Sequence, residues 1–247
     1  MPAPRAESET WRGPEFQGSP RSFALLYAPH SQRALLGTLF ALEHEISGAA
    51  RSGLEHSVAH VRLQWWYEES LRAAKGAALH PLARDAHAQL AARGVSGPDL
   101  SGLIEVTRWD LSGKAFATHS ELTAYCTQWA SAITVPVARC ALPGEQALAL
   151  DFGRRLGAAL RELELIEDLT PEAQDPKQHS RLRTELAECV ALLSARHQAP
   201  LRGLLVWAVL ARRRSIRASP LADAWQGWRA ARRAEAGRLV LQPESSR

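Results

Sequence analysis

Cysteines and long apolar runs are both scarce in this sequence. Only three cysteines occur among 247 residues: Cys126, Cys140 and Cys189. Their spacing fits no metal-binding motif, and their odd number argues against a framework of disulfide bonds, so we expect a reducing, cytoplasmic environment. No apolar run approaches the roughly 20 residues of a membrane-spanning helix, and the N-terminus lacks the charged-then-apolar pattern of a secretory signal. These absences argue against a disulfide-rich secreted protein and against a membrane-spanning one.

The alternation of Val, Ile, Thr and Tyr that predicts β-strands is nearly absent as well. Apolar residues make up 46% of the chain, which is rich in the helix formers Ala, Leu and Arg. We therefore predict an all-α protein with a single domain over residues 21–241. Residues 1–20 are polar and contain four prolines, which predicts a disordered arm, and residues 242–247 are expected to form a frayed tail.

Acidic residues are outnumbered by basic ones, 26 against 30, which gives a net charge of +4. This balance suits an anionic partner such as a nucleic acid, an anionic membrane or a diphosphate. Two helical stretches near the C-terminus are basic: residues 201–214, reading LRGLLVWAVLARRR, and a helix that contains Trp225, Trp228 and several arginines. The first stretch either docks on an anionic membrane surface or is a core helix whose basic end complements its dipole.

An acidic ladder is present near the end of a helix that we predict over residues 151–172. Glu164, Asp168 and Glu172 lie four residues apart, so their side chains stack on one helix face, about 6 Å apart along the axis. Three stacked carboxylates repel one another, and inward-facing carboxylates on packed helices can form a divalent-metal site. The alternative is a solvated acidic face, because charged residues usually face water.

This ladder, with the small residues before it, resembles the second metal-binding motif of the squalene/phytoene synthase family. The matching positions are Gly157, Ala159, Leu160, Asp168 and Glu172. The usual Asn is replaced by Glu164, and the usual final Asp by Glu172. The resemblance, which runs from about residue 21 to residue 172, implies the isoprenoid (terpenoid) synthase fold, a helical bundle around a central cavity. It also implies that Glu164, Asp168 and Glu172 hold Mg²⁺ if the protein is active.

Two further segments resemble parts of the substrate cavity of that family. Arg21, Ser22 and Phe23 match an R-S-F sequence that helps line the diphosphate end, and Tyr125 matches a tyrosine on the helix that lines the cavity. The resemblance therefore implies that these four residues bind the substrate, a farnesyl or geranylgeranyl diphosphate. The alternative for the first segment is an ordinary packing residue beside a surface arginine.

The first Asp-rich motif of the family is missing. Aligning its context on Ala41-Leu42 places Ser47, Gly48 and Arg51 at the positions of its three aspartates. A hydroxyl and a glycine cannot hold Mg²⁺ as carboxylates do, and an arginine repels it. The nearby Glu43 and Glu45 point to different helix faces and cannot replace the motif without a register shift. We therefore predict that the wall opposite the acidic ladder has no carboxylate within reach of a shared metal.

The segment ALEHEISGAARSG, followed by VRLQWWYEESL, resembles the branch of the family that contains a mitochondrial respiratory complex I assembly factor. That branch is regarded as having lost synthase activity. The resemblance implies a protein that keeps the fold and a prenyl-lipid-type cavity but is weakly active or non-catalytic. It also implies a role in lipid binding or an assembly-factor-like role. The ligand would be an isoprenoid, and the protein would associate peripherally with the inner face of a membrane.

The alternative is an active, Mg²⁺-dependent transferase that joins two prenyl diphosphates head to head. Such a reaction needs carboxylates on two facing helices, and the loss of one metal-binding wall is expected to slow it on the order of a thousandfold or more. Nucleic-acid binding rests only on the basic composition and the arginine-rich C-terminal part, so we expect no nucleic acid as partner.

Overall fold

The computed structural model describes residues 18–50, 55–97, 99–168, 174–213 and 219–242. Within these ranges the chain forms eleven α-helices and one short 3-10 helix, and they contain no β-strand. The helices are α1 (Pro20–Tyr27), α2 (His30–Ser47), η3 (Gly48–Ala50), α3 (His56–Ala74), α4 (Pro81–Ala91), α5 (Leu100–Ser112), α6 (His119–Ala141), α7 (Gln146–Glu167), α8 (Pro176–Ala191), α9 (Ala195–Gln198), α10 (Arg202–Arg213) and α11 (Pro220–Glu235). The predicted all-α class is confirmed. The predicted arm and tail lie almost entirely outside the described residues.

Several helices begin at signals that are visible in the sequence. Pro20 and Pro176 occupy first-turn positions, where the missing N–H of proline costs no hydrogen bond. The carboxylate of Asp175 accepts a hydrogen bond from the backbone N–H of Lys177 at 2.9 Å, which caps α8. A side-chain cap of this kind stabilises a helix by about 1 kcal/mol. Local chemistry therefore favours the starts of these helices.

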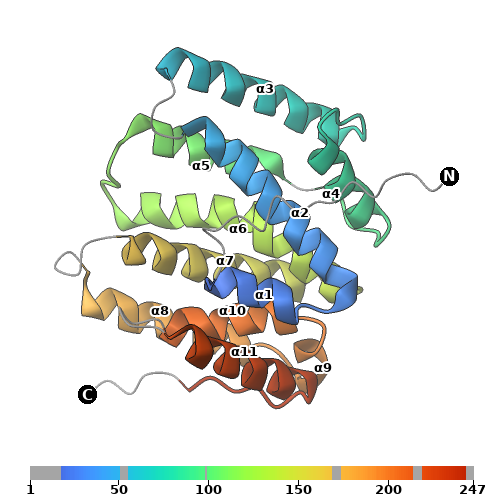
Figure 1. Ribbon diagram of the computed structural model, residues 1–247, viewed down its shortest axis with the longest axis vertical. Helices are drawn as coiled ribbons and strands as arrows, with labels where there is room; N and C mark the ends of the chain where they lie inside the picture. The colour runs from blue at the N-terminus through green and yellow to red at the C-terminus, as the bar shows by residue number, and fades with distance from the viewer. Residues whose placement is uncertain (1–17, 51–54, 98, 169–173, 214–218, 243–247) are drawn as a thin grey trace.

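The helices are stacked along the long axis of the molecule, with α3 at one end and α11 at the other (Figure 1). The pair α6 and α7 lies in the middle and makes the most extensive helix–helix contact. On one side α6 packs against α5 and α2, and α3 packs beyond α5. On the other side α7 packs against α8, and α10 packs against both α1 and α11. Residues far apart in the sequence on α1, α2 and α7 can therefore meet near the centre.

Small residues allow α6 and α7 to approach closely. A Cβ atom added at Gly157 would lie 2.0 Å from Thr134 Oγ1 and 2.6 Å from Ala130 Cβ. The Thr134 hydroxyl donates a hydrogen bond to the carbonyl of Gly153 at 2.7 Å across the same contact. The small residues before the acidic ladder therefore allow α7 to pack closely against α6.

The helix α10 resolves the alternative left open for the apolar C-terminal stretch. Its side chains are largely buried, including Leu205 and Trp207, which are 0% and 1% exposed. Of the two alternatives, the burial of the described residues 201–213 supports the core helix over the membrane-docking surface. Among the described residues, no helix has both the length and the apolar character required to cross a membrane.

Candidate functional site

The side chain of Arg21 on α1 lies between α2 and α7, near the centre of the molecule. Its Nη1 atom donates a hydrogen bond to Glu43 Oε2 on α2 at 2.6 Å. Its Nε and Nη2 atoms donate to the two carboxylate oxygens of Glu164 on α7 at 2.7 and 2.5 Å. The side chains of Arg21 and Glu43 are only 11% and 12% exposed. One nearly buried guanidinium thus joins α2 to α7, and its pair with Glu164 has the bidentate geometry that gives the strongest arginine–carboxylate pairs.

Three aromatic rings surround the guanidinium of Arg21. Its Cζ atom lies 5.4 Å from the ring centroid of Phe40, 5.2 Å from that of Trp129 and 5.3 Å from that of Trp207. The Trp129 indole N–H also donates a hydrogen bond to Glu43 Oε1 at 2.7 Å. Cation–π contacts of this kind stabilise a desolvated guanidinium by up to about 2 kcal/mol. These rings are buried and fill the space between α2, α6 and α10.

A second arginine, Arg161 on α7, extends the network toward α6 and α5. Its Nη1 atom lies 3.4 Å from Glu164 Oε2, and its Nη2 atom donates a hydrogen bond to the Tyr125 hydroxyl at 2.9 Å. That hydroxyl in turn donates to Asp110 Oδ1 at 2.9 Å. The hydroxyl of Tyr125, which the family resemblance assigned to substrate binding, therefore already has a donor and an acceptor within the protein.

The charged groups of this network have shifted pKa values. Burial alone would raise the pKa of Glu164, but the charge and hydrogen bonds of Arg21 outweigh it and lower that pKa. Burial likewise acts to lower the pKa of Arg21, and the Glu164 and Glu43 carboxylates reverse the effect and raise it. Burial raises the pKa of Tyr125 despite the opposing charge of Arg161. At neutral pH the centre therefore contains a permanently charged Arg21, an ionised Glu164 and a neutral Tyr125 hydroxyl.

The acidic ladder is divided between the interior and the surface. Glu164 points inward to Arg21, whereas Asp168 follows the last turn of α7 and is exposed. Glu172 lies outside the described residues. Glu164 and Asp168 line a pocket of about 220 Å³ beside Arg21 and Arg161. In the described part of the chain, no group of three or more His, Cys, Asp or Glu side chains could hold a metal ion. Mg²⁺ binding by the ladder stays a prediction.

The structure corrects the expectation for the wall opposite the ladder. Glu43 does face Glu164, with the guanidinium of Arg21 between the two carboxylates, whereas Glu45 is exposed. The two glutamates thus point to different faces, as expected, but one of those faces is the interior. A usable signal was present: Glu43 lies three residues after Phe40 and seven after Leu36, so it continues the buried stripe of α2.

The remaining predicted positions have structural partners. The Ser22 hydroxyl donates a hydrogen bond to the carbonyl of Ser19 at 2.7 Å, and Phe23 packs against the core. The Ser47 hydroxyl donates to the carbonyl of His44 at 3.2 Å, and Gly48 begins η3. Arg51 lies outside the described residues. Of the R-S-F segment, only the arginine reaches the charged centre, and it is not a surface residue.

Comparison with known proteins supports the resemblance that the motifs indicated. A model of the family described as squalene/phytoene synthase matches residues 17–182, about two thirds of the chain. The matched span contains Arg21, Glu43, Tyr125 and Glu164, and it ends within α8. Neither the curated proteins nor the solved structures that were searched gave a match.

Proposed function

This chain belongs to the squalene/phytoene synthase family, and we propose that it is a non-catalytic member, which keeps the helical fold but does not condense prenyl diphosphates. The observation that supports the proposal best is the side chain of Arg21, which forms ion pairs with Glu43 on α2 and Glu164 on α7. An internal cation therefore joins the two helices on which the family carries its metal-binding motifs.

The residues at the centre do not fit Mg²⁺. This ion prefers six oxygen ligands in octahedral geometry at about 2.1 Å. All four carboxylate oxygens of Glu43 and Glu164 accept hydrogen bonds from Arg21 or from Trp129. A metal bound between Glu43 and Glu164 would have to replace the N–H donors of Arg21. A metal bound next to Arg21 would be repelled by its guanidinium and by that of Arg161. The donor set favours a guanidinium.

The pocket beside Arg21 does not favour a diphosphate either. Its lining contains two arginines, Arg21 and Arg161, against three carboxylates, Glu164, Glu167 and Asp168. Both guanidinium groups already donate hydrogen bonds to Glu164. The volume of about 220 Å³ also lies below the roughly 300 Å³ at which pockets for drug-sized ligands begin. Although the family binds isoprenoid diphosphates in general, these features support a member that does not hold such a diphosphate in this pocket.

The active synthase remains the alternative, and it requires Arg21 to move out of the centre. Such a movement would leave Glu43 and Glu164 close together, largely buried and without their cation. Breaking a buried ion pair by removing one partner costs about 3–5 kcal/mol. The rings of Phe40, Trp129 and Trp207 would also lose their contacts with the guanidinium. Both requirements disfavour the alternative.

The test is an assay of diphosphate release by the purified full-length protein. Farnesyl or geranylgeranyl diphosphate is supplied with Mg²⁺, and an active synthase of the same family serves as the positive control. We expect no release above the protein-free reaction, and the same result for Asp168→Ala. Turnover at a rate typical of enzymes that is abolished by Asp168→Ala would overturn the proposal in favour of the synthase.

A further inference from the structure

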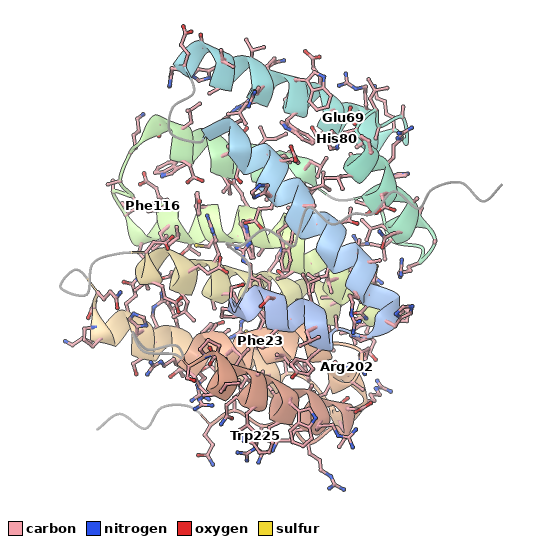
Figure 2. All side chains as sticks on the ribbon, in the orientation of Figure 1. Phe23, Glu69, His80, Phe116, Arg202 and Trp225 are labelled. Carbon is pink, nitrogen blue, oxygen red and sulfur yellow. The ribbon has the colours of Figure 1, made fainter. Side chains whose placement is uncertain are left out.

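The helix α11 presents two tryptophans to solvent. Trp225 and Trp228 are 55% and 46% exposed, and their rings are stacked with centroids 5.0 Å apart. Leu221, one turn earlier on the same face, is 83% exposed. Figure 2 shows Trp225 on the outer side of α11, at the end of the molecule's long axis. Large apolar side chains gathered on an exposed face indicate an interaction surface.

The packing of α11 fixes this orientation. Its opposite face is made of small buried residues, Gly227, Ala230, Ala231 and Ala234. A Cβ atom at Gly227 would lie 2.9 Å from the ring of Tyr27, and the Tyr27 hydroxyl donates a hydrogen bond to the carbonyl of Ala224 at 3.2 Å. The small face therefore packs closely on α1 and α10, and the tryptophans cannot turn inward without losing that contact.

The outward side of α11 is also positively charged. Arg229 and Arg233 are exposed, and neither forms an ion pair with another described residue. Arg232 is partly neutralised by Glu235 at 3.0 Å. Residues 201–247 contain ten basic and three acidic residues, whereas residues 1–200 contain 20 basic and 23 acidic ones. The excess positive charge of the protein is thus confined to the C-terminal region.

We propose that the outward face of α11, formed by Leu221, Trp225, Trp228, Arg229 and Arg233, docks onto the surface of an anionic lipid bilayer. Tryptophan suits the boundary between lipid chains and headgroups, because its ring is apolar and its N–H is polar. Arginines on the same side would contact the lipid phosphates. Because α11 lies at one end of the long axis (Figure 1), a flat surface can reach the tryptophans and the arginines together.

The exposed apolar side chains favour a lipid surface over a nucleic acid. Phosphate contacts by arginine would suffice for a nucleic acid, and the side chain of Leu221 would then stay in water. A bilayer buries Leu221 and the two indole rings while it neutralises Arg229 and Arg233. The proposal is independent of the absence of synthase activity, since α11 lies beyond the span that the family model matches.

Flotation with vesicles tests the proposal on the full-length protein. Vesicles of phosphatidylcholine with about one third phosphatidylglycerol are compared with vesicles of phosphatidylcholine alone. We expect binding to the first and little binding to the second, and we expect 0.5 M salt to weaken it, because salt screens exposed charges. Each arginine near such a surface strengthens binding roughly fivefold, so Arg229→Glu with Arg233→Glu should weaken it by more than tenfold. Trp225→Ala with Trp228→Ala should weaken it comparably.

A matched control is available at the opposite end of the molecule. On α3, Trp65 is 40% exposed and Arg62 is also exposed, and the variant Trp65→Ala with Arg62→Glu should bind anionic vesicles like the unaltered protein. Circular dichroism checks that each variant is folded. Equal binding to both kinds of vesicle, or binding that survives the α11 substitutions, would overturn the proposal. So would binding to duplex DNA through Arg229 and Arg233 without any binding to vesicles.

Discussion

At the centre of the protein, Arg21 donates three hydrogen bonds to two carboxylates and is enclosed by three aromatic rings. At the surface of α11, Arg229 and Arg233 are exposed beside tryptophans and form no ion pair within the described residues. A buried charge must be paired inside the protein, whereas an exposed one is available to a partner. The arginine at the centre is therefore saturated by partners within the protein, whereas the two arginines on α11 have charge left for the anionic surface proposed above.

The largest difference that we expect between the two regions is in how much an arginine contributes to the free energy of unfolding. Arg21→Ala leaves Glu43 and Glu164 without their cation, so we expect the free energy of unfolding to fall by about 3–5 kcal/mol. The control Arg233→Ala removes an exposed arginine and should change it by less than about 0.5 kcal/mol. Urea denaturation followed by circular dichroism measures both. Equal effects of the two substitutions would show that Arg21 contributes no more to stability than an exposed arginine does.

Neutralising the partners of Arg21 should reverse part of that loss. In the triple variant Arg21→Met, Glu43→Gln and Glu164→Gln, no charge is left unpaired at the centre. Replacing all members of a buried ion-pair group with well-packed hydrophobic residues is often nearly neutral for stability, because no charge is left buried without a partner; the two Gln substitutions also remove the charge, and they keep the shape of the carboxylates. We therefore expect the triple variant to be more stable than Arg21→Ala by at least about 1 kcal/mol. A triple variant that is less stable than the single one would contradict ion pairing as the function of Arg21.

Substituting a closely packed glycine should also destabilise the centre more than α11, but this difference should be smaller than the one between the arginines. In Gly157→Ala the new methyl group meets Thr134 and Ala130 of α6 at 2.0 and 2.6 Å, so we expect a loss of about 1–3 kcal/mol. In Gly227→Ala the nearest atom, at 2.9 Å, belongs to the ring of Tyr27, which can shift. The loss should therefore be smaller on α11. Thermal denaturation of the two variants measures this difference, and a greater loss at Gly227 would show that α11 is the more tightly packed contact.

We expect Glu164 at the centre, rather than the surface of α11, to make the free energy of unfolding depend on pH in acid solution. The pKa of Glu164 is lowered in the folded protein, so the folded state binds its proton more weakly than the unfolded state does. Its stabilising contribution is present above the unfolded pKa and is lost as the pH falls through the folded one. Below about pH 5 we expect Glu164→Gln to lose less stability per pH unit than the unaltered protein. Arg229→Gln should leave the slope unchanged, and denaturation at several pH values compares the three.

The sequence predicted the helical class, because this depends on local periodicity, but it left open whether Glu164 faces the interior or water. It did not predict the partners of Arg21, which lie 22 and 143 positions away. Spacing along one helix cannot reveal a contact between α1 and α7. Glu43 was predicted not to replace the missing motif because it and Glu45 point to different helix faces, although the buried stripe of α2 already included its position. The division of the chain into arm, domain and tail stays a prediction.

A crystal structure of the protein grown with Mg²⁺ and farnesyl thiodiphosphate, an analogue that reacts very slowly, would decide whether Arg21 or a metal joins α2 to α7. We expect Arg21 to stay within hydrogen-bonding distance of both Glu43 and Glu164, with no metal between them. A Mg²⁺ ion bound by Glu43 and Glu164, with Arg21 displaced and the analogue seated beside it, would show instead that a metal joins the two helices.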